Sequence, residues 1–152
     1  MYHREIINES LIKLNFHANT KEDVLKEIAD IAFNAKRVES AEAYFNGMLE
    51  RERTSTTGFG GGIAIPHAKI DAILKPTISV IKLREAVDWE AMDDKPVQLI
   101  IALAVPANQE GTLHLQLLAK LSENLMEEKF TGSLLSAKTK NEIYQIITSI
   151  FE

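Results

Sequence analysis

The sequence predicts one α/β domain in which helices near both ends of the chain pack in layers on a central sheet. Three observations lead to this fold class. Apolar residues recur at helical spacing in the first and last thirds, and β-rich runs broken by prolines fill the middle third. The length of 152 residues suits one domain with a buried core. Interleaved helices and strands favour a layered α/β arrangement over separate units.

The first third of the chain predicts two helices after an ambiguous start. Residues 11–16 alternate in a way that fits either a strand or a frayed helix, and both interpretations stay open. Thr20 and Asp23 form a capping-box pattern, and apolar residues then follow at helical spacing over residues 24–35. The first helix is therefore expected to begin just after Thr20.

A second helix is expected after Ser40, which can cap it. Its apolar face would hold Ala41, Tyr44, Phe45, Met48 and Leu49. The helix should end near Arg53, because the run Thr-Ser-Thr-Thr-Gly at residues 54–58 favours local hydrogen-bonded turns.

The middle third predicts strands at residues 63–66, 77–83 and 97–105. Prolines at positions 66, 76, 96 and 106 border these runs. The run Val-Gln-Leu-Ile-Ile-Ala-Leu-Ala-Val at 97–105 is apolar on both faces, which is typical of a central strand covered by helices on both sides.

Helical spacing returns in the last third. Leucines at 113, 117, 118, 121 and 125 predict a helix that starts just after Gly111 and Thr112. Thr139 and Glu142 form a second capping-box pattern, which predicts a final helix after Thr139 whose apolar positions are Ile143, Ile146, Ile147 and Ile150.

Composition excludes several classes of function. Seventeen Lys and Arg against 22 Asp and Glu give a net charge of −5 without a basic stripe, which argues against a nucleic-acid or anionic-membrane surface. The absence of cysteine excludes disulfides, thiolate metal sites and a cysteine nucleophile. The longest apolar run, residues 99–105, is too short to span a membrane, and residues 1–10 lack the apolar segment of a secretory signal. We therefore expect a cytoplasmic protein.

Among the four histidines, His67 is the best candidate for chemistry. His3 and His17 lie in polar surroundings that indicate solvated surface positions. His67 follows Pro66 at the expected end of a short strand, behind the glycine run 60–62. Such glycines let a backbone or an anion approach closely, although a tight turn feeding a strand is the commoner use of an isolated glycine run. The run matches neither a P-loop nor a dinucleotide fingerprint.

His114 and Arg51 are weaker candidates on their own pattern. His114 falls in the first turn of the predicted helix after Thr112, where unpaired N–H groups favour a nearby anion, but a histidine without a task is commoner there. Arg51 stands among charged residues at a helix end, where a solvated face is the default interpretation. The metal spacing H-E-x-x-H and the nucleophile elbow G-x-S-x-G are both absent.

Residues 52–68, E-R-T-S-T-T-G-F-G-G-G-I-A-I-P-H-A, resemble the signature of the enzyme IIA (EIIA) domain of the sugar phosphotransferase system (PTS), fructose/mannitol type. The constrained positions of that signature correspond to Glu52, Phe59, Gly60, Ile63, Ala64, Ile65, Pro66, His67 and Ala68. Further segments, including V-D-W-E at 87–90 and H-L-Q-L-L at 114–118, resemble the fructose branch. The resemblance covers most of the chain, so we expect residues 1–152 to form one EIIA type-2 domain with a mixed sheet between helical layers.

This resemblance implies a phosphoryl carrier. Family members accept a phosphoryl group from phospho-HPr, a small carrier protein, and pass it to a cognate EIIB domain that serves a membrane EIIC domain. Carried over, His67 would be phosphorylated, His114 would be the second active-site histidine, and Arg51 would lie near the phosphate. No metal or other cofactor is implied. Independently of the resemblance, we expect glycines 60–62 to line the approach to the histidine. Docking of two partner proteins calls for an exposed apolar patch, for which Phe59, Ile63 and Ile65 are candidates, although core packing is the expected role of the isoleucines.

Two alternatives to sugar transport remain open from the sequence. The nitrogen-related branch of the same family is phosphorylated on the same histidine but acts by binding proteins. A sensory module related to transcription regulators is a third possibility, although no DNA-binding helix pair is evident. The sugar, the oligomeric state and the identity of the EIIB and EIIC chains do not follow from these residues.

Overall fold

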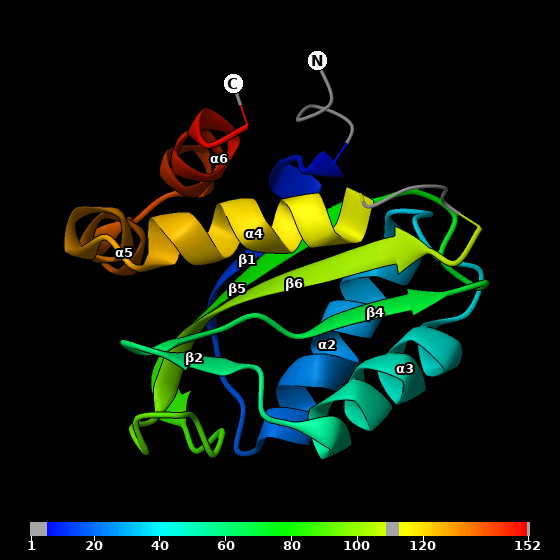
Figure 1. Ribbon diagram of the computed structural model, residues 1–152, viewed down its shortest axis with the longest axis horizontal. Helices are drawn as coiled ribbons and strands as arrows, with labels where there is room; N and C mark the ends of the chain where they lie inside the picture. The colour runs from blue at the N-terminus through cyan, green and yellow to red at the C-terminus, as the bar shows by residue number, and fades with distance from the viewer. Residues whose placement is uncertain (1–5, 109–112, 152) are drawn as a thin grey trace.

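A mixed sheet of six strands runs through the middle of the molecule (Figure 1). The computed structural model describes residues 6–108 and 113–151, with the backbone alone for residues 113 and 114. The strands are β1 (Ile12–Phe16), β2 (Gly58–Gly60), β3 (Ile63–Ala64), β4 (His67–Ile70), β5 (Thr77–Val87) and β6 (Val97–Pro106).

Strand β6 is the centre of this sheet. It pairs antiparallel with β5 on one side and parallel with both β3 and β4 on the other. The outer strands are β1, parallel to β5, and β2, antiparallel to β3. Nine of the ten β6 residues are buried, which confirms the prediction of a central strand covered on both faces.

Helices cover both faces of the sheet (Figure 1). One layer consists of α2 (Lys21–Asn34) and α3 (Ala41–Thr54). The opposite layer contains the short 3₁₀ helix η1 (Glu9–Leu11) together with α4 (Leu113–Leu125), α5 (Glu128–Ser136) and α6 (Lys140–Ser149). The predicted α/β/α class with a mixed central sheet is therefore confirmed. No helix in the described ranges is both long and apolar enough to cross a membrane.

Three of the predicted helices have an N-cap residue whose side chain accepts a hydrogen bond from the first helical turn. The hydroxyl oxygens of Thr20, Ser40 and Thr139 each accept a hydrogen bond from the backbone N–H three residues later, at 3.1 Å. Each bond satisfies a donor that the first helical turn leaves unpaired. The helices therefore start where the sequence predicts.

Other boundaries differ from the prediction. The ambiguous residues 11–16 form the end of η1 and then strand β1. The strand expected at 63–66 ends at Ala64, because Pro66 has no N–H to continue the ladder. Helix α5 was not predicted, since its N-cap residue Glu127 makes no side-chain cap bond and Gly132 lies within it. Strands β2 and β4 are too short and glycine-rich or polar to show alternation.

A candidate phosphoryl-transfer site

His67 is the first residue of β4. Strands β3 and β4 follow each other along the same edge of β6, and both pair with it in parallel. Strand β3 pairs Ile63 with Leu99, and β4 pairs His67 with Leu103. Ile65 and Pro66 lie between the two strands and leave the regular ladder. The histidine was expected at the end of the preceding strand, and this placement is wrong because Pro66 breaks that strand before His67.

Two hydrogen bonds define the orientation and tautomer of the half-buried His67 ring. Its Nδ1 atom lies 2.8 Å from the carbonyl oxygen of Ile65, which can only accept, so Nδ1 carries the proton. Its Nε2 atom accepts a hydrogen bond from Nε of Arg51 at 3.1 Å. Both contacts fit the neutral ring with its lone pair on Nε2, since a proton there would face the N–H of Arg51.

Arg51 reaches His67 from the last turn of α3. Its Nη1 atom donates to the carbonyl oxygen of Ser55 at 2.9 Å and lies 3.4 Å from the Ser55 hydroxyl. Ser55 is the C-cap of α3, so the guanidinium also binds a carbonyl that the helix end leaves available. The charge pattern around Arg51 did not place it beside His67, but the family resemblance implied that it lies near the phosphate, and the structure brings the two side chains together.

Gly47 explains how α3 comes so close to β4. A Cβ atom on this glycine would lie 3.3 Å from both Cβ of Ala68 and Cγ2 of Ile70. Residues 47 and 51 are four apart and share one face of the helix. A small residue one turn before Arg51 therefore lets the guanidinium reach the start of β4.

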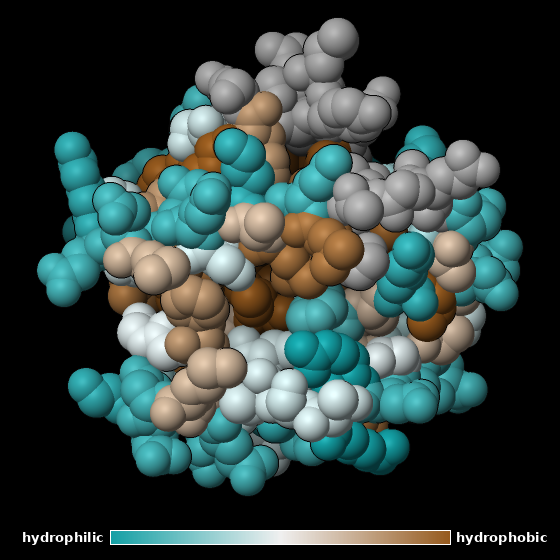
Figure 2. Space-filling view, in the orientation of Figure 1, coloured by the Kyte–Doolittle hydropathy of each residue, from teal (hydrophilic) through white to brown (hydrophobic). Residues whose placement is uncertain are grey.

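Arg51 and His67 line one surface pocket together with Gly47, Glu50, Thr54, Ala68, Lys69, Ile70, Leu115 and Leu118. The far wall comes from α4, on which Leu115 is 53% exposed. Figure 2 shows hydrophobic surface gathered near α4 on this side of the molecule and hydrophilic surface over α3. The pocket thus combines charged side chains from α3 and β4, namely Glu50, Arg51 and Lys69, with leucines from α4.

His114 is the second residue of α4, in the first turn as the sequence predicts. Its side chain lies outside the described residues. Leu118, four residues later on the same helix, lines the pocket.

The glycine run forms the tight turn between β2 and β3. Gly60, Gly61 and Gly62 have positive φ angles of 113°, 65° and 85°, which glycine adopts without strain. The N–H of Gly61 donates to Oδ2 of Asp93 at 3.0 Å. The structure therefore supports the turn interpretation, because this amide binds a carboxylate of the chain itself and the run does not line the His67 pocket.

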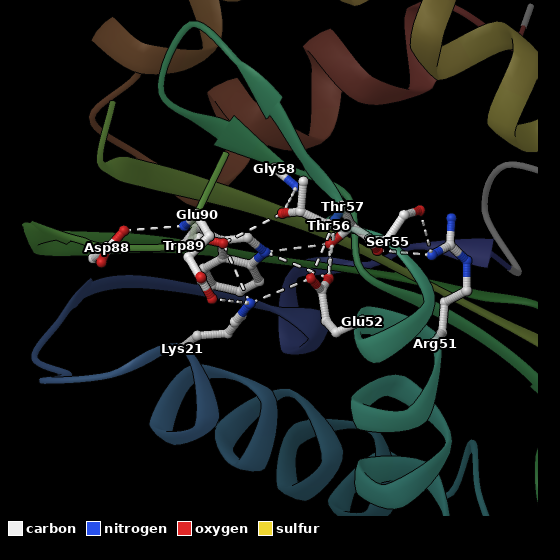
Figure 3. Close-up of polar contacts among 10 residues, drawn as sticks. All are labelled: Lys21, Arg51, Glu52, Ser55, Thr56, Thr57, Gly58, Asp88, Trp89 and Glu90. Atoms are coloured by element: carbon white, nitrogen blue, oxygen red, sulfur yellow. Dashed lines mark hydrogen bonds and ion pairs between the residues drawn. The ribbon is translucent and has the colours of Figure 1, made fainter. Parts of the chain in front are cut away.

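A cluster of polar side chains surrounds the buried carboxylate of Glu52, the residue after Arg51 (Figure 3). The Glu52 carboxylate accepts hydrogen bonds from the backbone N–H and hydroxyl of Thr57 and from Nε1 of Trp89. Nζ of Lys21 lies 3.5 Å from Oε2 of Glu52. The sequence indicates Glu52 only as a signature position, because two of its partners, Lys21 and Trp89, are remote from it along the chain.

The remaining candidates take ordinary positions. Ile63 and Ile65 are buried at 0% and 8% exposure, so they pack in the core as expected. His17 is exposed, and His3 lies outside the described residues. Within the described part of the chain, no three His, Asp or Glu side chains are placed together to hold a metal ion.

Comparison with sequence families identifies a match over residues 5–150. The matching model is described as "Phosphoenolpyruvate-dependent sugar phosphotransferase system, EIIA 2". A "PTS system fructose-specific EIIA component" from Haloferax volcanii is 42% identical over 142 residues, covering 93% of this chain and 92% of the relative. A "Nitrogen regulatory protein" from Escherichia coli K12 is 33% identical over 145 residues, covering 94% and 87%.

The chain also matches one segment of a longer relative. A "PTS system fructose-specific EIIABC component" from Bacillus subtilis is 36% identical over 143 residues, which cover 94% of this chain and 22% of that protein.

Solved structures share the whole fold. The nitrogen regulatory protein IIA-Ntr from Neisseria meningitidis superposes with a TM-score of 0.89 at 29% identity, covering 97% of this chain and 99% of that one. The mannitol enzyme IIA from Escherichia coli, solved with phosphorylated enzyme IIB, has a TM-score of 0.78 at 24% identity, covering 94% and 97%. The latter likeness concerns the fold alone.

Proposed function

Because the chain belongs to the EIIA 2 family of the phosphoenolpyruvate-dependent sugar phosphotransferase system, we propose that it carries a phosphoryl group on Nε2 of His67. The donor is phospho-HPr and the acceptor is a fructose-type EIIB domain, with a membrane EIIC domain served indirectly. The observation that carries this proposal is the 3.1 Å contact between the lone pair of His67 Nε2 and the Arg51 guanidinium.

The chemistry requires a neutral nucleophile in line with the donor. As the lone pair of Nε2 forms a bond to phosphorus, the phosphorus–nitrogen bond of phospho-HPr breaks and its electron pair returns to the donor imidazole. The Nδ1 proton of His67 stays hydrogen-bonded to the Ile65 carbonyl throughout. In the neutral ring this bond selects the tautomer with the lone pair on Nε2, and it supports the positive charge that develops on the ring during attack.

Arg51 has two roles in the proposed step. In the unphosphorylated protein it donates to Nε2, and this donation must end before the lone pair can attack. The guanidinium then turns its donors to the equatorial oxygens of the phosphoryl group, where charge-assisted bonds are strong. The bond to Ser55 holds the guanidinium nearby during this change.

We assign His114 to the phosphoryl oxygens as well. The assignment is supported by the position of His114 in the first turn of α4, four residues before Leu118, which lines the pocket. The partial positive charge at a helix start favours the same anion. Replacement His114→Ala should slow uptake from phospho-HPr or block onward transfer, measured by following labelled phosphate on each protein.

A regulatory output is the second candidate. The specific observation is the likeness to nitrogen regulatory proteins, at 33% identity in sequence and a TM-score of 0.89 in structure. A regulator would use the same histidine but pass its signal by binding another protein. We prefer transport because the fructose-specific relative is more similar, at 42% identity.

One transfer experiment tests the proposal and separates the two outputs. The protein is incubated with labelled phospho-HPr, and purified fructose-type EIIB is then added. The proposal expects acid-labile label on the wild type, none on His67→Ala, and rapid transfer to EIIB. Label on His67→Ala at the wild-type rate would contradict the site, and stable label that no sugar-specific EIIB accepts would favour the regulator.

A further inference from the structure

We infer that Glu52 is a positioning residue for the proposed transfer, because its buried carboxylate holds the chain segments that orient both Arg51 and His67. The inference rests on the proposed function and adds a residue that contacts neither the phosphoryl group nor the reacting nitrogen. Glu52 acts through residues 55–57, the loop that follows α3 (Figure 3).

The Glu52 side chain is 3% exposed and almost surrounded by donors. The N–H of Thr57 lies 3.1 Å from Oε2 and 3.3 Å from Oε1, and the Thr57 hydroxyl and Nε1 of Trp89 also donate to Oε1. Lys21 supplies the compensating charge and is itself fixed by a 3.2 Å bond to the Trp89 carbonyl. A buried carboxylate is stable only with this degree of pairing.

The first connection leads from Glu52 to His67. Thr57, held by the carboxylate, accepts a 2.9 Å hydrogen bond from the N–H of Ile65 at its carbonyl oxygen. The carbonyl of Ile65 in turn accepts the Nδ1 proton of His67 at 2.8 Å. Ile65 lies outside β3 and β4, so the bond to Thr57 replaces the ladder contact that would otherwise fix this carbonyl.

The second connection leads from Glu52 to Arg51. The two residues are neighbours in the last turn of α3, and their side chains leave the helix in different directions (Figure 3). Arg51 binds the carbonyl of Ser55, two residues before Thr57. One carboxylate therefore fixes the loop at Thr57, and the loop fixes the guanidinium at Ser55.

A residue that only stabilised the fold would leave the His67 tautomer unchanged. Without the Ile65 carbonyl in place, the ring loses the bond that selects a proton on Nδ1. The tautomer is thus the property that separates positioning from general stabilisation, and it is measured on the unphosphorylated protein without any partner. Phosphoryl uptake should fall as well, because small misplacements of reacting groups cost about 10- to 100-fold in rate.

The test compares Glu52→Gln with the wild type by nitrogen NMR of the histidine rings. The glutamine amide keeps the shape but turns donors toward Thr57 and loses the charge opposite Lys21. We expect the His67 proton to redistribute from Nδ1 toward Nε2, and uptake from phospho-HPr to slow about 10- to 100-fold. Glu42→Gln, an exposed glutamate in the first turn of the same helix, is the charge-matched control and should change neither readout.

Thr57→Val provides a second variant if Glu52→Gln does not fold. It removes the hydroxyl that binds Glu52 and accepts from Trp89 at 3.3 Å, but keeps the backbone N–H. A smaller change in the same direction in both readouts is expected. A folded variant with a lower melting temperature, the wild-type tautomer and the wild-type rate would overturn the inference. Absence of label on the wild type would contradict the proposed function, while the tautomer comparison would still test Glu52.

Discussion

The two helical layers cover the same sheet but differ in what they bury against it. The layer of α4, α5 and α6 packs aliphatic side chains almost exclusively, among them Leu121, Leu134 and Ile147, each 0% exposed. The layer of α2 and α3 buries Trp89, Tyr44 and the polar cluster around Glu52. The candidate site lies at the edge of this second layer, where α3 meets β4.

This difference indicates that one layer mainly stabilises the fold and that the other mainly positions the residues of the candidate site. Aliphatic packing is stabilising, is roughly proportional to the apolar area buried, and needs no particular orientation. Buried polar groups must be paired, so they impose a single arrangement on the loop beside them. Variants at buried aliphatic positions away from the pocket should therefore change stability alone, and variants of Arg51 and of the polar cluster around Glu52 should change transfer.

The largest expected effect in the polar layer is that of Arg51→Gln. Losing a charged donor to the developing phosphate should reduce the transfer rate about 100- to 1,000-fold, the cost of removing one such donor elsewhere. The unfolding free energy should change little because the side chain is partly exposed. Rapid-quench transfer from phospho-HPr measures the rate, and a rate within twofold of wild type would remove Arg51 from the site.

Arg51→Lys sharpens this prediction. Lysine keeps the charge but lacks the planar set of donors that reaches His67 and Ser55 together. Its rate should lie between those of the wild type and Arg51→Gln, as measured in the same rapid-quench assay. A full return to the wild-type rate would show that charge alone is needed.

The matching change in the aliphatic layer is Ile147→Ala in α6. Truncating this fully buried side chain should lower the unfolding free energy by about 2–5 kcal/mol through lost burial and a residual cavity. The transfer rate per folded molecule should equal that of wild type. Urea unfolding measures the change in stability, and the transfer rate is measured at temperatures well below the unfolding transition. A folded variant that transfers phosphate ten times more slowly than wild type would contradict the proposed difference between the two layers.

Tyr44→Phe tests whether every polar group in the α2–α3 layer serves the site. The Tyr44 hydroxyl is buried without a hydrogen-bond partner among the described residues, and burial raises the pKa of Tyr44. Removing an unpaired buried hydroxyl should leave stability unchanged or raise it by about 1–2 kcal/mol. A loss of more than that in urea unfolding would mean that the hydroxyl is paired in solution.

Asp93→Asn, which alters the carboxylate bound by the glycine turn, should have the smallest effect, a slight change in melting temperature. Hydrogen bonds from the N–H groups of Gly61 and Lys95 lower the pKa of Asp93 in the folded protein. The charged form therefore stabilises the fold at pH values above the ordinary aspartate pKa of about 3.9, and this contribution disappears as pH falls through the lower folded-state pKa. Melting temperatures should differ slightly at pH 7 and converge under acid conditions, with transfer unchanged. A growing difference in acid would contradict the assignment.

Much of this architecture follows from local sequence patterns. Capping residues such as Thr20 and Thr139 mark helix starts because their hydroxyls act within one turn. The apolar run of β6 predicts its central place because both of its faces are buried. Helix α5 lacked such signals, and its start at Glu128 became visible only in the structure.

Only part of the site could be predicted, because several of its contacts join residues that are far apart along the chain. His67 was recognisable from a contiguous signature, but its contact with Arg51 depends on Gly47 letting α3 approach β4. The Glu52 cluster joins three segments of the chain, including Lys21 and Trp89, that no local pattern connects. The glycine run 60–62 shows that a local pattern can also mislead. Such a run can bind an anionic ligand, but here the N–H of Gly61 donates to the carboxylate of Asp93 in the same chain.

The most direct test of the account is to find which atom carries the phosphoryl group. The protein is labelled with nitrogen-15 in histidine, treated with phospho-HPr and examined by phosphorus–nitrogen correlation NMR. The account predicts one phosphorus bonded to Nε2 of His67 while Nδ1 keeps its proton. Phosphorus on Nδ1 of His67, or on any other residue, would contradict it.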